Sequence, residues 1–139
     1  MPSKQPKMTI KRFAHEYFVK VSFVDIYGRN IGYDYSTILA EIKKHFPHAN
    51  TSRRWLQDMA YVLNRSERLP VRRRSRRALA QEYALSMLLR QRNGAGLKYA
   101  SIGAACRSKF PDQRTSVASL RKLEGHLRRL EFTVPTRPA

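Results

Sequence analysis

Basic side chains are the residues of this sequence with the clearest chemical potential. Guanidinium and ammonium groups neutralise negative charge and donate charge-assisted hydrogen bonds to phosphate oxygens. The most prominent of them are Arg53, Arg54, Arg72, Arg73, Arg74, Arg76, Arg77, Arg114, Arg121 and Lys122. The densest group lies within residues 65–77, which carry a net charge of +6. This pattern predicts a partner with dense negative charge.

Catalysis and metal binding are not indicated by the remaining reactive residues. Only 10 acidic residues stand against 28 basic ones, so a carboxylate pair for proton transfer or a carboxylate cage is hard to assemble. The single cysteine, Cys106, excludes a zinc site built from several cysteines. Residues 94–96 lack the preceding strand and the third glycine of a dinucleotide site. We therefore expect a protein that is not an enzyme and has no cofactor or metal.

The composition combines this charge with enough apolar residues for a folded core. The 139 residues have a net charge of +18, yet 42% of them are hydrophobic and 10% are aromatic. A disordered basic tail would be depleted in both. No apolar stretch approaches the roughly 18 residues of a membrane span, and the N-terminus does not resemble a signal peptide. These features predict a cytoplasmic protein without a membrane partner.

An internal repeat organises the chain. Residues 35–63 align without gaps on residues 99–127 at an offset of 64, with nine identical pairs among 29, where chance would give about two. Upstream, residues 14–17 resemble residues 80–83 at an offset of 66. The repeat predicts two tandem modules that arose by duplication.

Each module is expected to contain three helices. The first is predicted over residues 13–27 in one copy and 78–92 in the other. The second starts near Ser36 or Ala100 and ends before a proline, and the third begins at Thr51 or Thr115, whose hydroxyls can cap it. The predicted divisions are a basic arm (1–12), a first module (13–64), an arginine-rich linker (65–77), a second module (78–132) and a tail (133–139).

The repeated residues resemble the three-helix helix-turn-helix DNA-binding superfamily, without pointing to one family within it. They include Tyr35, Ile38, Ala40, Phe46, Pro47, Thr51, Ser52 and Leu56, all of which recur as identical residues at an offset of 64 in an all-α pattern. The resemblance implies that each third helix enters the major groove of DNA. The candidate DNA-binding residues are Thr51, Ser52, Arg53, Arg54, Gln57, Arg72, Arg73, Arg74, Arg76, Arg77, Arg114, Thr115, Ser116, Arg121 and Lys122.

A sequence-selective double-stranded DNA-binding protein is the function that this reasoning favours. It would act as a small, nucleoid-associated transcriptional regulator, and its size suits a phage, plasmid or other mobile element. Two modules on one chain could act as a monomer or as a weak homodimer. The alternatives are a protein-interaction adaptor or inhibitor with a basic surface, and an RNA-binding protein.

Overall fold

Helices form most of the regular structure of the chain. The computed structural model describes residues 8–73 and 75–138, and it places six helices and four two-residue strands in them. In chain order these are α1 (Ile10–Val19), β1 (Phe23–Val24), β2 (Asn30–Ile31), α2 (Tyr35–His45), α3 (Arg53–Ser66), α4 (Arg76–Leu89), β3 (Gln91–Arg92), β4 (Ala95–Gly96), α5 (Tyr99–Lys109) and α6 (Val117–Arg129). The predicted all-α class is confirmed at this coarse level. None of the described helices has the length and apolarity needed to cross a membrane.

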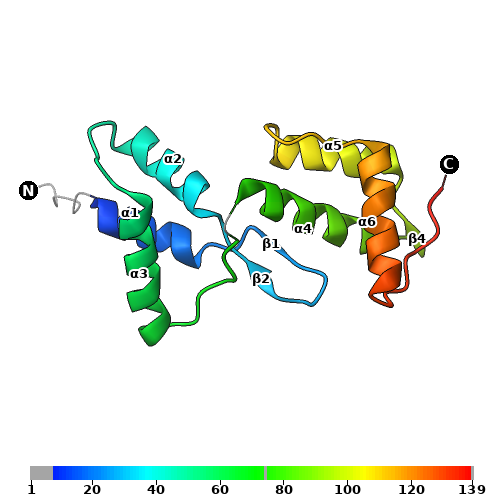
Figure 1. Ribbon diagram of the computed structural model, residues 1–139, viewed down its shortest axis with the longest axis horizontal. Coiled ribbons are helices and arrows are strands. Elements are labelled where there is room, and N and C mark those ends of the chain that lie inside the picture. The colour runs from blue at the N-terminus through cyan, green and yellow to red at the C-terminus, as the bar shows by residue number, and fades with distance from the viewer. Residues whose placement is uncertain (1–7, 74, 139) are drawn as a thin grey trace, which may run out of the picture. The chain divides into compact units, whose positions relative to one another are not determined.

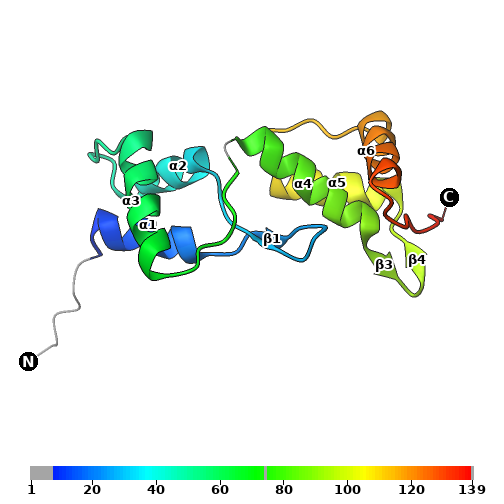
Figure 2. The same cartoon turned by 60° about the horizontal axis from the view of Figure 1, so that its bottom comes forward.

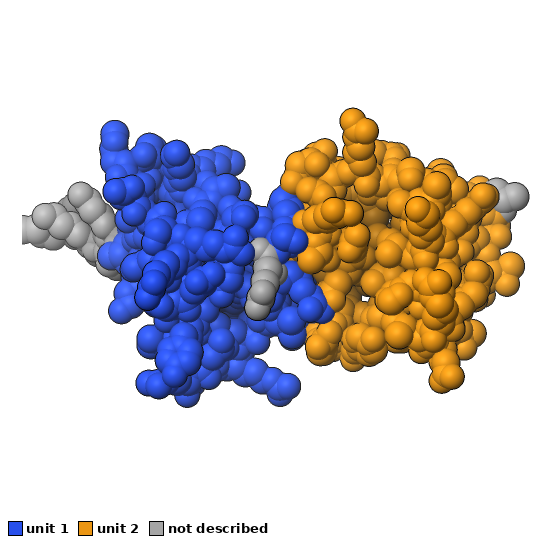
Figure 3. Space-filling model, in the orientation of Figure 1, with its two compact units in different colours: residues 1–22, 30–76 blue, residues 23–29, 77–139 orange. Residues whose placement is uncertain are grey.

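Two compact units make up the chain. Unit 1 comprises residues 1–22 and 30–76, and unit 2 comprises residues 23–29 and 77–139 (Figure 3). Helices α1, α2 and α3 belong to unit 1, whereas α5, α6 and all but the first residue of α4 belong to unit 2. In each unit the third helix, α3 or α6, runs crosswise to the other two (Figures 1 and 2).

Each unit has its own apolar core, made by the helix faces that the spacing of apolar residues predicts. The buried core of unit 1 contains Phe13, Ala14, Phe18, Ile38, Ile42, Leu56, Met59 and Ala60. The buried core of unit 2 contains Ala84, Met87, Leu88, Ile102, Cys106, Leu120 and Leu127. Cys106 is thus a buried thiol, as its alignment with Ile42 predicts.

The first helix of unit 1 is shorter than predicted because a β-hairpin follows it. Helix α1 ends at Val19, whereas the predicted helix ran to Tyr27. The Asp25 carboxylate accepts hydrogen bonds from the backbone N–H groups of Tyr27 (3.0 Å) and Arg29 (2.8 Å), and Gly28 has a φ of +78°. A side chain that bonds to its own turn in this way competes with helix formation, so the predicted helix over residues 13–27 is wrong in its second half.

The corresponding helix α4 also gives way to a hairpin. It ends at Leu89 rather than at the predicted Arg92, and β3 pairs antiparallel with β4. The two connecting residues, Asn93 and Gly94, have φ values of 55° and 79°. Two successive residues of positive φ match the short turn that suits the twist of a hairpin.

The first helices of the two units correspond at an offset other than the predicted one. The Phe13 ring lies 5.7 Å from that of Phe46, and the Tyr83 ring lies 5.7 Å from that of Phe110. Phe46 and Phe110 are 64 residues apart, whereas Phe13 and Tyr83 are 70 apart. The predicted pairing of residues 14–17 with 80–83 at an offset of 66 does not match these contacts, because the hairpin of the first copy is longer.

Serines, not the predicted threonines, cap the third helices. The Oγ atoms of Ser52 and Ser116 accept hydrogen bonds from the backbone N–H groups three residues later, at 3.2 and 3.1 Å. Thr51 and Thr115 are the residues immediately before these caps. Each cap therefore lies one residue later than predicted, and each third helix begins two residues later, at Arg53 or Val117.

Removing the cap of α3 is expected to destabilise unit 1 measurably. Ser52→Ala should lower the free energy of unfolding by about 1 kcal/mol, the usual contribution of a helix N-cap. The matched control Thr51→Ala should have a smaller effect, and Trp55, the single tryptophan, reports unfolding in urea by its fluorescence. A larger loss for Thr51→Ala than for Ser52→Ala would contradict this assignment of the cap.

Candidate nucleic-acid interface

The start of α3 presents two arginines to solvent. Arg53, Arg54 and Gln57 are exposed, whereas Leu56 points into the core and is fully buried. The guanidinium carbon of Arg53 lies 5.6 Å from the centre of the Tyr35 ring, a cation–π distance that orients the side chain. The first two turns of α3 thus offer two cations and an amide, the groups that bind phosphates and base edges.

The start of α6 has a different chemistry. Its first residue, Val117, is 45% exposed, and the cations come one turn later, at Arg121 and Lys122, which are both exposed. The guanidinium carbon of Arg121 lies 5.7 Å from the centre of the Tyr99 ring. Arg114 is exposed in the turn before the helix. The α6 surface therefore carries cations around an apolar first residue.

Arg72, a predicted DNA contact, lies inside unit 1. Its guanidinium donates hydrogen bonds to the backbone carbonyls of Tyr33 and Phe18, the latter at 2.7 Å, and its carbon lies 4.8 Å from the centre of the Phe18 ring. A Cβ atom at Gly32 would lie 2.9 Å from Nη1 of Arg72, so this close approach needs a glycine. Burial lowers the pKa of Arg72 to about 10, which leaves it charged at neutral pH. The N–H groups of Arg72 thus bind carbonyls of its own unit and stabilise the fold.

Arg137 holds the corresponding position in unit 2 and is not among the predicted site residues. Its guanidinium donates to the backbone carbonyls of Leu88 and Leu97, the latter at 3.1 Å, and its Nε pairs with the Glu124 carboxylate. The side chains of Arg137 and Glu124 are each only 6% exposed. A Cβ atom at Gly96 would lie 2.9 Å from Nη1 of Arg137. We call Arg72 and Arg137 the clasp arginines.

The carboxylate of Glu124 remains ionised despite its burial. The Tyr99 hydroxyl donates a hydrogen bond of 2.7 Å to it. Burial by itself would raise the pKa of Glu124, but the hydrogen bonds from Tyr99 and Arg137 and the charges of Arg137 and Arg128 outweigh burial, so the pKa is lowered. Glu124 thus supplies a full negative charge to its clasp arginine.

A sequence signal could have revealed the clasp arginines. Both belong to a Pro-x-Arg triplet, at residues 70–72 and 135–137, which lie 65 residues apart. In each unit the backbone N–H of the glycine, Gly32 or Gly96, donates a 2.9 Å hydrogen bond to the carbonyl of the middle residue. The two units therefore share this triplet and its glycine contact beyond the third helices, in the predicted linker and tail.

The other arginines of the predicted linker have different environments. Arg73 is half-buried, and Arg76 donates a 2.9 Å hydrogen bond to the Thr37 hydroxyl. Arg77 is exposed at the start of α4. Arg74 lies outside the described residues. The densest charge of the sequence is thus divided between the interior of unit 1 and solvent.

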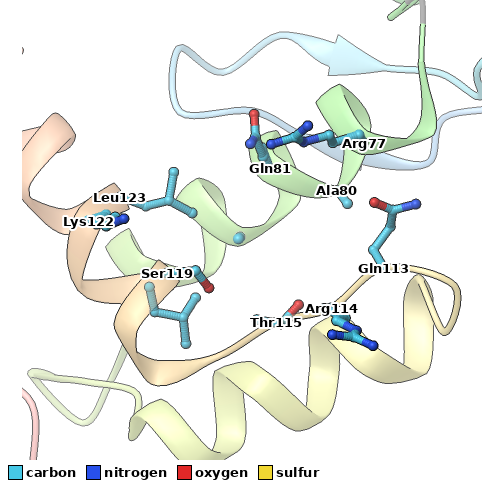
Figure 4. Close-up of a pocket in the computed structure, with 11 residues that line it drawn as sticks. Arg77, Ala80, Gln81, Gln113, Arg114, Thr115, Ser119, Lys122 and Leu123 are labelled. Carbon is cyan, nitrogen blue, oxygen red and sulfur yellow. The ribbon is translucent and has the colours of Figure 1, made fainter.

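A cleft of about 270 Å³ in unit 2 gathers several of the predicted site residues. We call it the α4–α6 cleft, because its walls come from these helices and from the turn before α6 (Figure 4). It is lined by Arg77, Ala80, Gln81, Ala84, Gln113, Arg114, Thr115, Ser119, Leu120, Lys122 and Leu123. Four of these residues are predicted DNA contacts, and Figure 4 shows that they come from separate segments.

Comparison with known proteins adds no relative to this picture. No family model, curated protein or solved structure matches the chain. Across residues 8–73 and 75–138, there is also no group of three or more histidine, cysteine or acidic side chains placed to hold a metal ion. What the described surface offers to a partner is hydrogen bonding and charge neutralisation by exposed cations.

Proposed function

We propose that this protein is a non-enzymatic, sequence-selective binder of double-stranded DNA that acts as a small transcriptional regulator. The observation that carries the proposal is the construction of α3 and α6. Each buries an apolar side in its own unit and keeps cations exposed within its first two turns, at Arg53 and Arg54 or at Arg121 and Lys122. A helix of this kind can lie in a major groove, with its side chains on base edges and phosphates.

We further propose that the two units are duplicated helix-turn-helix modules. Support comes from contacts that recur in both, namely the aromatic pair between the first and second helices and the clasp arginine on a glycine. Two modules on one chain would give a monomer two half-sites, whereas single-module regulators reach two half-sites by dimerising. The half-sites would differ in sequence, because the starts of α3 and α6 differ.

The net charge of +18 would supply most of the affinity. Each phosphate neutralised by Lys or Arg releases counterions, so binding weakens steeply as salt rises. The third helices would add sequence preference to this general attraction.

Changing the arginines of α3 is expected to affect specific binding most. Arg53→Ala or Arg54→Ala should cost about 1 to 3 kcal/mol on a duplex selected from random sequences, and less on a random duplex. Fluorescence anisotropy of labelled duplexes measures both affinities, and Arg129→Ala, at the far end of α6, is the control of equal charge. If the wild-type protein enriches no sequence from random duplexes, selective binding is excluded.

One observation favours a second function, recognition of a protein partner. Tyr61 and Val62 in α3 are 64% and 61% exposed, and large exposed apolar side chains are common at protein interfaces. The Tyr61 hydroxyl accepts a 3.0 Å hydrogen bond from Arg65. Gel shifts with duplex DNA and duplex RNA separate the DNA-binding and RNA-binding functions. A protein that shifts neither duplex would favour the protein-binding function.

A further inference from the structure

The α4–α6 cleft has a strongly one-sided charge. Arg77, Arg114 and Lys122 line it, and no acidic residue does. All three cations are exposed, and none of them has a carboxylate partner among the described residues. Three unpaired cations around one hollow repel one another and favour an anion between them.

The neutral residues of the cleft restrict the kind of anion. Gln81 and Gln113 contribute side-chain amides and Thr115 and Ser119 contribute hydroxyls, whereas the apolar part of the lining consists of Ala80, Ala84, Leu120 and Leu123. A compact inorganic anion would leave this apolar part uncovered. A sugar–phosphate unit of a nucleic-acid strand combines an anionic group with apolar sugar carbons, which matches both parts of the lining.

Unit 1 has a cleft at the corresponding place, but its chemistry differs. It is lined by Thr9, Ile10, Lys11, Asn50, Thr51, Ser52 and Trp55. Lys11 is the one cation in this lining of described residues, and Asn50 occupies the position that corresponds to Arg114. Trp55 stands where unit 2 has Ser119, so a large ring replaces a small hydroxyl. An adjoining hollow of unit 1, which shares Thr9 and Lys11, adds Arg12, but Arg12 lies 3.9 Å from the Glu16 carboxylate. Within the described part of the chain, three cations without a carboxylate partner thus line the cleft of unit 2, and fewer line the hollows of unit 1.

We propose that the α4–α6 cleft binds a sugar–phosphate unit of the DNA backbone, and that unit 2 contributes mainly affinity that does not depend on sequence, with α6 adding the weaker half of the sequence preference. This inference rests on the proposed DNA binding and assigns different tasks to the units. Unit 1 reads bases through Arg53 and Arg54, whereas the cleft of unit 2 contributes affinity that is the same on every duplex. Selection from random duplexes would then give a motif with one strong half.

The test compares two triple variants of the full chain that lose the same charge. The cleft variant carries Arg77→Gln, Arg114→Gln and Lys122→Gln. The control variant carries Arg92→Gln, Lys98→Gln and Arg129→Gln, which are exposed residues of unit 2 that do not line the cleft. Anisotropy titrations use a selected duplex and a random duplex of equal length at several salt concentrations, and circular dichroism checks that each variant is folded.

The cleft variant should lose about tenfold or more in affinity on both duplexes, and its salt slope should fall by about 1 to 2, as expected for one or two lost phosphate contacts. The control variant should lose clearly less. If the two variants behave alike while the wild-type protein binds DNA, the cleft inference is wrong and the proposed function stands. If the wild-type protein binds neither duplex, the proposed function itself fails. The three single substitutions replace the triple variant if the latter does not fold.

Discussion

Replacing Arg137 with methionine is expected to lower the free energy of unfolding of unit 2 by about 3 to 5 kcal/mol, the usual cost of removing one partner of a buried ion pair. Glu124 would stay buried without its cation, and the carbonyls of Leu88 and Leu97 would lose their donor. Methionine retains an unbranched apolar side chain, so the loss arises mainly from charge and hydrogen bonding. Hydrogen exchange of the Leu127 amide, in α6, measures the effect in unit 2.

Arg128 provides a matched control on the same carboxylate. Its guanidinium lies 3.9 Å from Glu124, but its side chain is 63% exposed, so Arg128→Met should lower the free energy of unfolding by only about 0 to 1 kcal/mol.

Because the pKa of Glu124 is lowered in the folded chain, the stabilising contribution of Glu124 is complete above its ordinary pKa of 4.5 and is lost as the pH falls through the lowered value. The difference in the free energy of unfolding between the wild-type protein and Arg137→Met should therefore become smaller as the pH falls below 4.5. Equal losses for the two variants at neutral pH would contradict a buried clasp.

The second large effect is expected at Arg72. Arg72→Met should destabilise unit 1 by about 3 kcal/mol, because it leaves the partly buried carbonyls of Phe18 and Tyr33 without this charged donor. The urea transition of Trp55 fluorescence follows this unit. Arg68, exposed in the same arginine-rich segment, gives the control Arg68→Met, which should leave the transition nearly unchanged.

Arg72→Met also separates the two roles that an arginine in this segment could have. Under conditions in which the variant is folded, its DNA affinity should show the wild-type dependence on salt, because the guanidinium faces protein carbonyls. An unchanged Trp55 transition combined with a smaller salt slope would place Arg72 on DNA instead.

The elements that could be predicted from the sequence are those fixed by local signals. Helices α2 and α5 end where Pro47 and Pro111 require it, and the apolar spacing in α3 predicts its buried side at Leu56 and Met59. The caps of the third helices are misplaced by only one residue, because threonine and serine are adjacent and both are good caps.

The features that could not be predicted depend on partners distant in sequence. The ends of α1 and α4 are decided by hairpins, and the apolar periodicity of residues 19–27 fits a helix as well as a strand. Likewise, the number of arginines in residues 65–77 does not indicate which of them packs inside a unit. The Arg72 guanidinium is partly buried against Gly32, 40 residues earlier, where the absence of a Cβ atom leaves room for it. Only the recurrence of Pro-x-Arg at 135–137 distinguishes it in the sequence.

The assignment of residues 23–29 to unit 2 has a consequence for the order in which the protein is made. The Phe23 ring lies 5.4 Å from that of Tyr83, and the Tyr27 ring lies 5.7 Å from that of Phe132. Phe23 and Tyr27 are synthesised before their partners Tyr83 and Phe132. Their rings therefore lack these contacts during the synthesis of the rest of unit 1. A gene fragment for residues 77–139 would in turn encode a unit that lacks this segment. Recombination at the boundary near residue 76 would therefore transfer all of unit 1 but would divide unit 2.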